Sequence, residues 1–474
     1  MLFLSTEFVL FFGIVFVLYW TMGRVSGQAQ NVVLLASGMF FYGWADIRFL
    51  GLLTLSAATN YVLGLAIEDA KNDTRRRLWF WCGMAFNFGM LAYFKYFGFF
   101  YDSIVGLLNH FGGQHDQLTL KIALPLGISF FTFQVAGYLI DVFNGSIDAC
   151  RKPLRFFTYV FHFPKLLSGP VERAQQFLPR ITNVRTFDTA MVTDGTRQLL
   201  WGMFSKSVIA DNLAPIVDKV YADIPGSNGS TLFLAALLYL IQLFADFAGY
   251  SNMAIGLSKI LGLPLTINFR APLFVTNISE FWRKWHISLT SWMMDYLFTP
   301  LSFLLRDKGR AGSMIAIFIT FLAVGIWHGA NWTFIVFGLL QGIYFLPLVL
   351  AGRVNVAPSR KWWQHVIAMA GMFVLMSLTF VLMRAPDLSS AWDYVKGICD
   401  WSITEKPDMV LRTILLPLCL FIGGEWFARG DDHVLQRWGT GDHWAFRWSG
   451  YSLLITLTLL SMSTEETGFI YFQF

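Results

Sequence analysis

Long apolar stretches run through the whole chain and are separated by short polar loops. A helix that crosses a bilayer needs about 20 mostly apolar residues, and shorter stretches suit re-entrant segments. The pattern predicts an all-α polytopic membrane protein with roughly 11–14 transmembrane or re-entrant helices. The stretches lie near residues 5–22, 31–45, 49–67, 78–100, 121–141, 155–168, 195–210, 231–248, 287–305, 311–328, 332–350, 365–383, 410–427 and 449–463.

Composition supports a membrane protein. Of the 474 residues, 55% are hydrophobic and 14% are charged, whereas soluble domains average about 25% charged residues. The 18 tryptophans suit the two membrane interfaces, where indole rings anchor helices. No hydrophilic segment is long enough to form a separate soluble domain, so we expect one membrane domain over residues 1–474. Its first apolar stretch has no cleavage motif and is interpreted as a retained helix.

The charged loops predict an orientation. Basic residues gather at Lys71–Arg77, Arg151–Lys152 and Arg306–Arg310, and the positive-inside rule puts such loops in the cytoplasm. Loop 104–120, with His110, is poor in Lys and Arg and suits the outside. The net charge of +5 lies in short loops, which favours contact with membrane lipid and argues against nucleic-acid binding.

His328 is the most unusual residue, because it lies in the apolar stretch Ala311–Gly352. One helix over that stretch would be about 60 Å long, twice the hydrocarbon thickness of a bilayer. We therefore expect a break within 327–332, where Gly329 and Asn331 permit one. An ionisable residue inside a membrane indicates function, while a structural histidine bonded to a backbone carbonyl is an equal alternative at this point.

A second charged stretch, Asn277–Pro300, mixes ionisable and aromatic residues. Glu280 and Lys284 have i, i+4 spacing, and Arg283 and His286 have i, i+3 spacing, so helical geometry would put each pair on one face. The alternative is an amphipathic helix that faces lipid phosphates at the cytoplasmic interface.

Three further features are weaker signals. Asp246 lies in an apolar helix and needs a partner, either Arg270 or Lys206, unless it serves only as a helix-to-helix hydrogen bond. Pro164 and Gly169 interrupt an apolar segment, whose backbone must then be buried or line a cavity. The four cysteines have no metal-site spacing and are expected to be small buried hydrophobic residues, and we predict no metal site.

Taken together, these stretches resemble the membrane-bound O-acyltransferase family, and within it the bacterial branch that contains the alginate O-acetyltransferase membrane subunit. The resemblance covers nearly the whole chain. The matching motifs are EFWRKWHISLTSWMMDYLF at 280–298, GIWHGANWTFIVFGLLQG at 325–342, QLFADFAGYSNMAIGLSKILG at 242–262, LPLGISFFTFQVAGYLIDVFNG at 124–145, FPKLLSGPVERAQQF at 163–177 and the C-terminal FIYFQF. Met294 and the turn Pro300–Phe303 depart from the branch pattern, which leaves the acceptor polymer open.

The resemblance implies a fold with a central pocket or funnel and two catalytic histidines, His328 and His286. It also implies that a cytoplasmic donor, acetyl-coenzyme A, supplies an acetyl group for an exopolysaccharide of the alginate or cellulose kind. No cofactor would be permanently bound, the protein would lie in the bacterial inner membrane, and periplasmic partners or the polysaccharide would accept the group.

Acyl transfer needs a base, an oxyanion stabiliser and exclusion of water. We assign His328 as the base, Asn331 to orient it or to stabilise the oxyanion, and Trp327 with Trp332 to exclude water. The other residues that we assign to substrate or donor binding are Arg283, Trp285, Asp295 and Asp246.

Two other functions remain open. A transporter of acyl groups or lipid-linked sugars would also have broken helices and buried charges. Acyl transfer to peptidoglycan or teichoic acid would use the same chemistry on a different polymer.

Overall fold

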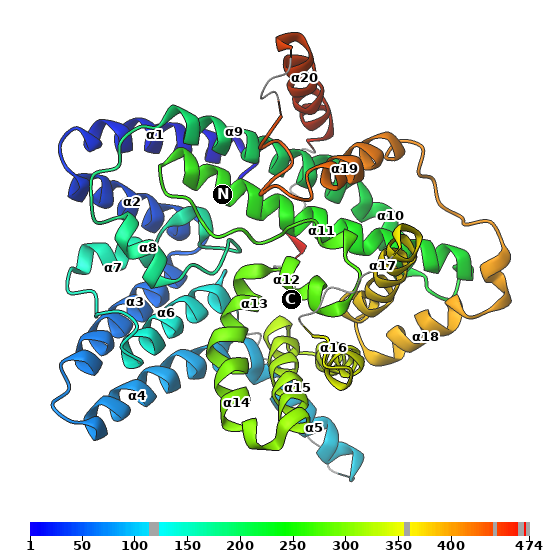
Figure 1. The fold of residues 1–474 in the computed structure, drawn as a ribbon, viewed down its shortest axis with the longest axis horizontal. Helices are drawn as coiled ribbons and strands as arrows, with labels where there is room; N and C mark the ends of the chain where they lie inside the picture. Colours follow the sequence, from blue (N-terminus) through cyan, green and yellow to red (C-terminus); the bar gives the residue numbers. More distant parts are fainter. Residues whose placement is uncertain (113–122, 355–360, 439–442, 463–468, 471–474) are drawn as a thin grey trace. The chain divides into compact units, whose positions relative to one another are not determined.

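The computed structural model describes residues 1–112, 123–354, 361–438, 443–462 and 469–470. The chain forms two compact units, one of Met1–Thr196 with Ala254–Thr266 and the other of Arg197–Met253 with Ile267–Phe474. In the described ranges the regular structure is entirely helical (Figure 1). The predicted all-α class is confirmed.

Most helices of the first unit come from the N-terminal part of the chain (Figure 1). They are α1 (Thr6–Gly23), α2 (Gly27–Gly43), α3 (Ile47–Glu68), α4 (Asp73–Leu91), η1 (Ala92–Tyr96), α5 (Phe97–His110), α6 (Ile128–Phe143), α7 (Pro153–Val160), η2 (Phe163–Lys165) and α8 (Ala174–Arg180). Two more helices, α9 (Thr189–Phe204) and α11 (Gly229–Ile260), run from one unit into the other.

The second unit contains the remaining helices. They are η3 (Ser205–Ala210), α10 (Asp211–Ala222), η4 (Pro272–Phe274), α12 (Ile278–Lys284), α13 (Ile287–Met293), η5 (Met294–Phe298), α14 (Thr299–Leu304), η6 (Arg306–Lys308), α15 (Gly309–His328), α16 (Trp332–Leu350), α17 (Trp362–Arg384), α18 (Leu388–Ile398), η7 (Trp401–Thr404), α19 (Leu415–Phe427) and α20 (Trp444–Ser461).

Six helical segments of the described chain are long and apolar enough to cross a membrane. They are Thr6–Gly23, Ile47–Glu68, Gly229–Ile260, Arg306–His328, Trp332–Leu350 and Trp362–Arg384, and two shorter apolar helices are Ile128–Phe143 and Leu415–Phe427. The prediction of a multi-pass membrane protein is confirmed.

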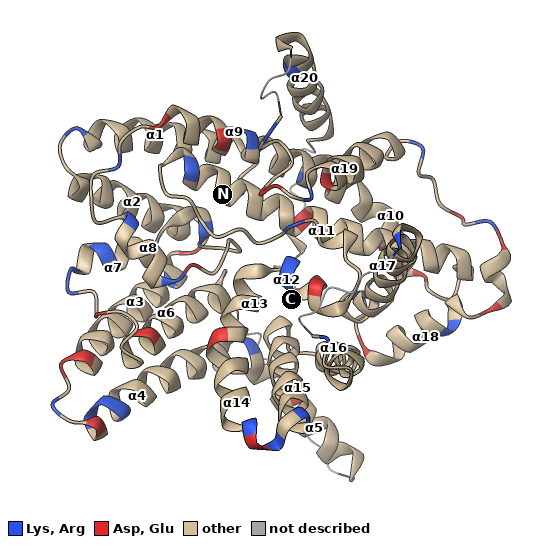
Figure 2. Cartoon of the chain, in the orientation of Figure 1, with Lys and Arg blue, Asp and Glu red and all other residues tan. Residues whose placement is uncertain are grey.

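Polar residues begin the helices of the first unit. The side chains of Ser5, Ser26, Asp46 and Asn72 accept hydrogen bonds from backbone N–H groups in the first turns of α1, α2, α3 and α4. Such caps satisfy donors that have no partner within the helix. Figure 2 shows that charged residues lie mostly at helix ends and in loops, so most of the apolar helix lengths are free of charge, with Asp246 in α11 as an exception.

Two buried asparagine side chains join α3 to α4 in the first unit. Asn60 of α3 and Asn87 of α4 exchange two side-chain hydrogen bonds of 2.9 and 2.7 Å, which satisfy both buried amides.

The predicted interruption in residues 161–173 is confirmed, because α7 ends at Val160 and only the short η2 follows before α8.

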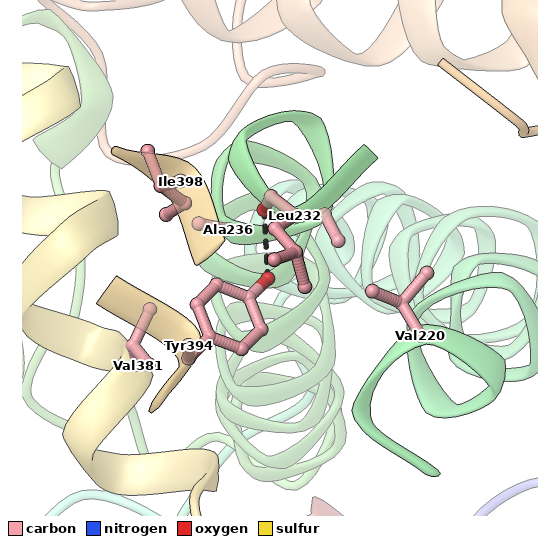
Figure 3. Packing of buried hydrophobic residues seen from close by; sticks show 7 residues of the cluster. Val220, Leu232, Ala236, Val381, Tyr394 and Ile398 are labelled. Atoms are coloured by element: carbon pink, nitrogen blue, oxygen red, sulfur yellow. Dashed lines mark hydrogen bonds between the residues drawn. The ribbon is translucent and has the colours of Figure 1, made fainter. Parts of the chain in front are cut away.

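An apolar cluster joins α10, α11, α17 and α18 in the second unit (Figure 3). The Tyr394 hydroxyl donates to the Leu232 carbonyl at 2.7 Å, so a buried polar group is satisfied inside the cluster. The other labelled members are Val220, Ala236, Val381 and Ile398.

Helices α15 and α16 form a close hairpin with only Gly329, Ala330 and Asn331 between them. A methyl group on Gly338 would overlap the Phe321 carbonyl, and one on Gly325 would overlap the Phe334 carbonyl. Small residues let membrane helices approach this closely. The predicted break within 327–332 is confirmed.

Several expectations for individual segments need correction. Cys82 and Cys419 are exposed rather than buried, because they lie on outward faces of α4 and α19. Cys399 is exposed directly after the end of α18, and Cys150 is half-buried. Residues 104–110 belong to α5 instead of a loop, since the apolar run continues through a π-turn at η1. The remainder of that loop, from residue 113, lies outside the described residues, as does most of FIYFQF.

Candidate active site

His328 is the last residue of α15 and is 3% exposed. Its ring centroid lies 5.1 Å from that of Trp327, 5.8 Å from that of Phe337 and 6.3 Å from that of Phe334. The last two residues belong to α16, so the two arms of the hairpin enclose the imidazole. The hairpin thereby holds an ionisable ring in a largely apolar, water-poor setting.

His286 lies in a sharp turn between α12 and α13. Its φ of 46° is left-handed, and in the described chain Ala271 is the one other non-glycine residue with positive φ. Such a conformation costs about 1–3 kcal/mol and persists only where surrounding contacts enforce it. The predicted shared helical face of Arg283 and His286 is therefore wrong, because α12 ends at Lys284 before the chain reaches His286.

Asn268 supplies the enforcing contacts. Its side-chain oxygen accepts from the Ser288 hydroxyl at 2.6 Å and from the Ser288 N–H at 3.2 Å, and its amide donates to the Ser251 hydroxyl at 3.1 Å. Its carbonyl accepts from the Ile287 N–H at 2.8 Å. Asn268 is fully buried, so one side chain joins the turn after His286 to α11.

The two histidines meet the same indole ring. The Trp327 centroid lies 5.5 Å from that of His286, as well as 5.1 Å from that of His328. Phe247 of α11 contacts His286 edge-on, with 4.6 Å between centroids. Burial lowers the pKa of His286 well below its usual 6.5, and repulsion from nearby His328, when that ring is protonated, adds a smaller effect in the same direction. His286 is therefore held neutral at physiological pH.

Asp246 belongs to a buried ionic network beside this cluster. Its carboxylate lies 2.6 Å from the Lys206 ammonium, which also lies 2.8 Å from Asp211. A second carboxylate oxygen accepts from the Ile470 N–H at 2.9 Å. The predicted partner Lys206 is confirmed, whereas Arg270 pairs with Asp432 at 2.6 Å.

Trp285 lies in an aromatic core. It is 1% exposed and its ring stacks on Phe281, with further contacts to Phe269 and Phe380 at centroid distances of 5.2–5.3 Å. Trp282, on the same helix, donates from its indole nitrogen to the fully buried Gln341 of α16 at 3.1 Å. The hydrogen bond from Trp282 joins α12 to the hairpin that carries His328.

The charged residues of the second stretch lie outward. Lys284 pairs with Glu280 at 3.0 Å, which confirms the i, i+4 prediction. Arg283 is exposed and donates to the Ser279 hydroxyl at 2.8 Å. Asp295 is exposed in η5. The structure therefore does not bring Arg283 and Asp295 into the buried histidine cluster.

Asn331 and Trp332 also differ from their predicted places. The Asn331 side chain caps α16 by accepting from the Thr333 N–H at 3.0 Å and donates to the Pro386 carbonyl at 2.7 Å. Its hydrogen bonds are thus used to end the break in the hairpin. Trp332 is 54% exposed, so Trp327 alone of the two tryptophans walls the histidines.

Sequence reasoning missed Asn268, Gln341 and the residue Phe469, which packs on Phe247 and Tyr250 at 5.8 and 5.0 Å between centroids. Asn268 and Gln341 do stand out as polar residues within apolar segments. That signal marks a buried polar group but does not identify its partner. In the described chain no three His, Cys, Asp or Glu side chains gather closely enough to hold a metal ion.

The cluster offers a neutral imidazole in an enclosed aromatic setting, next to a second one. A neutral imidazole accepts a proton, and exclusion of water protects a reactive acyl group from hydrolysis. Proton abstraction from a hydroxyl during group transfer is chemistry that this arrangement can perform.

Comparison with known proteins points to the same chemistry. The model of the MBOAT, membrane-bound O-acyltransferase family matches residues 151–383. The probable alginate O-acetylase AlgI of Azotobacter vinelandii is 35% identical over 403 residues, covering 82% of this chain and 77% of the relative. A peptidoglycan O-acetyltransferase of Helicobacter pylori is 31% identical over 494 residues, covering 93% and 91%. A teichoic acid D-alanyltransferase of Bacillus subtilis is 29% identical over 252 residues, covering 50% and 63%.

Proposed function

The chain belongs to the membrane-bound O-acyltransferase family, and from that premise we propose that it delivers acetyl groups for O-acetylation of an extracellular polysaccharide. Family membership makes it a multi-pass membrane acyltransferase. The proposal adds the donor, the acceptor and the membrane. Acetyl-coenzyme A in the cytoplasm supplies the group, and the protein lies in the bacterial inner membrane.

The observation that carries the proposal is the pair of buried histidines that both contact the ring of Trp327. An acyltransferase must accept a proton from a hydroxyl while water is kept away. His328 and His286 are 3% and 1% exposed, and aromatic rings surround both. A purely structural histidine would not need a second imidazole held beside it by a strained turn.

In the proposed reaction, His328 accepts the proton of an acceptor hydroxyl as its oxygen attacks the acetyl carbonyl carbon. The new C–O bond forms, the C–S bond of the thioester breaks, and the thiolate receives the proton as the free thiol. His286 positions the site through its contact with Trp327. No oxidant or further reactant is required.

The acceptor hydroxyl belongs either to the polymer or to a periplasmic acetyltransferase that modifies the polymer in a second step. The likeness to probable alginate O-acetylases favours an alginate-like acceptor. The match to a peptidoglycan O-acetyltransferase covers more of both chains, so peptidoglycan is the second candidate. Both acceptors require the same first transfer.

The test is turnover of radiolabelled acetyl-coenzyme A by the purified full chain in lipid nanodiscs, with acceptor polymer added. We expect His328→Ala to lower label transfer at least 1,000-fold, in the range seen when a general base and its associated stabilisation are lost. The matched control is His365→Ala, because His365 is exposed on α17. Label transfer by His328→Ala at the rate of His365→Ala would refute the assignment.

A further inference from the structure

A cavity of about 550 Å³ lies in the first unit, beside the C-terminal end of α3. Its volume falls in the range of small-molecule sites, roughly 300–1,000 Å³. Its walls come from Glu68, the segment before α7, the first turn of α7, and α8 with Thr182. Three cationic side chains line it: Arg151, Lys152 and Arg155.

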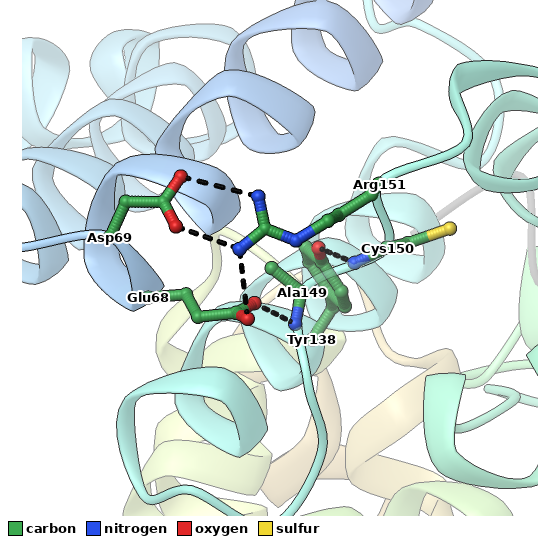
Figure 4. Close-up of polar contacts among 6 residues, drawn as sticks. All are labelled: Glu68, Asp69, Tyr138, Ala149, Cys150 and Arg151. Carbon is green, nitrogen blue, oxygen red and sulfur yellow. Dashed lines mark hydrogen bonds and ion pairs between the residues drawn. The ribbon is translucent and has the colours of Figure 1, made fainter.

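Arg151 forms ion pairs with two carboxylates. Its guanidinium lies 2.7 Å from Asp69 and 3.2 Å from Glu68, at the end of α3 (Figure 4). The next backbone N–H, that of Cys150, donates to the Tyr138 hydroxyl at 3.0 Å. This wall of the cavity is therefore fixed by contacts to α3 and α6.

Lys152 and Arg155 differ from Arg151 in their contacts. Among the described residues neither forms an ion pair, and Arg155 makes one side-chain hydrogen bond, to the Thr182 carbonyl at 3.3 Å. They stand three residues apart at the start of α7, so both cations reach the same volume. The lining has two carboxylates, Glu68 and Asp148. Glu68 pairs with Arg151 and Asp148 is exposed, so outside that pair the lining carries two cations and one solvated anion.

The position of the cavity at the end of a candidate membrane span indicates headgroup depth. The candidate span Ile47–Glu68 ends in its wall, and a span ends where the hydrocarbon gives way to the polar headgroups. The basic start of α4, residues 75–77, follows within a few residues (Figure 2). Ile147, Leu178 and Pro179 add an apolar wall, which suits a ligand with a polar head and an apolar body.

We propose that this cavity binds a phosphate group of an amphiphilic ligand, with Lys152 and Arg155 contacting the phosphate. A phospholipid of the adjoining leaflet is the source that the depth and the apolar wall favour. A phosphorylated soluble donor presents the same group, so the experiment separates the two. The proposal does not depend on the acyl-transfer reaction.

The experiment measures binding of dihexanoyl-phosphatidylglycerol to the purified full chain in detergent, by native mass spectrometry. The variant Lys152→Gln/Arg155→Gln removes both cations from the cavity. Each Lys or Arg near a membrane surface contributes a factor of about five to binding an anionic lipid, so we expect the dissociation constant to rise roughly 30-fold. The charge-conserving variant Lys152→Arg/Arg155→Lys is expected to stay within about threefold of the parent chain.

The matched control is Lys71→Gln/Arg77→Gln, which removes two exposed cations from the same side outside the cavity. Equal weakening by both double variants would show mere attraction to surface charge and would overturn the proposal, as would unchanged binding by the cavity variant. Coenzyme A titrated in place of the lipid identifies the source. Binding of coenzyme A alone, lost in the cavity variant, would keep the phosphate site and assign it to a soluble donor.

Discussion

The buried network of Lys206 with Asp246 and Asp211 allows a quantitative test of what holds the second unit together. The side chains of Lys206 and Asp246 are 10% and 1% exposed, so water screens this pair little. The substitution Lys206→Met leaves the Asp246 carboxylate buried in an apolar helix without its cation. Breaking a buried ion pair in this way costs about 3–5 kcal/mol of stability. The change removes a charge but keeps a long apolar side chain.

The opposite substitution is expected to be milder. In Asp246→Asn, Lys206 keeps Asp211 at 2.8 Å, and the asparagine oxygen still accepts from the Ile470 N–H. The loss is then one charge-assisted hydrogen bond, about 1.5–3 kcal/mol. The double variant Lys206→Met/Asp246→Asn has no buried carboxylate at residue 246. Its loss of stability should therefore be about 2 kcal/mol smaller than the sum of the losses in the two single variants.

The assay is equilibrium unfolding in mixed micelles, monitored by tryptophan fluorescence, of the parent chain, the two single variants and the double variant. The exposed pair Lys396–Asp393, 3.4 Å apart with side chains 59% and 58% exposed, is the control cycle. Its coupling energy should stay within about 0.5 kcal/mol. If the buried cycle couples no more strongly than this control, or if Asp246→Asn is the more damaging single change, the reasoning fails.

Three other perturbations test the site. Gly338→Val should destabilise the hairpin by about 1–3 kcal/mol, because its side chain would overlap the Phe321 carbonyl; thermal unfolding checks this, and an unchanged Tm would contradict it. Asn268→Ala leaves the buried Ser288 N–H without its acceptor and should cost about 1–3 kcal/mol and lower acetyl transfer, whereas normal transfer would show that the turn is held by other contacts. The pKa of His286 is lower in the folded than in the unfolded chain, so the unfolded chain binds more protons below pH 6.5. As the pH is lowered below 6.5, the free energy of unfolding should therefore decrease by up to about 1.4 kcal/mol per pH unit. In His286→Asn, which tolerates positive φ, that part of the slope should disappear; an unaltered slope would exclude His286 as its source.

Features that depend on length or on the cost of a buried charge could be predicted from the sequence. The break after His328 followed from the mismatch between one long helix and the bilayer, and the structure ends α15 at His328. Asp246 needed a cation, and Lys206 was one of two candidates. Both arguments use only local sequence and a physical limit.

Features that depend on distant contacts could not be predicted. Helical spacing assigned Arg283 and His286 to one face, but the chain leaves the helix at Trp285 because Asn268 binds the backbone and hydroxyl of the following turn. Asn331 looked like a partner for the imidazole, yet its position directly before α16 makes it a helix cap. A short polar side chain has several possible partners, and only the fold selects among them.

The α15–α16 hairpin has a consequence for biosynthesis. Both arms are apolar enough to span the membrane, and three residues connect them. So short a connection lets the two arms enter the bilayer together as one helical hairpin, with His328 at its tip. Their combined hydrophobicity, rather than any feature of the histidine, therefore carries the ionisable ring across the membrane. A charged residue placed in the middle of either arm would therefore impair membrane insertion of the hairpin, and any loss of activity would follow from that.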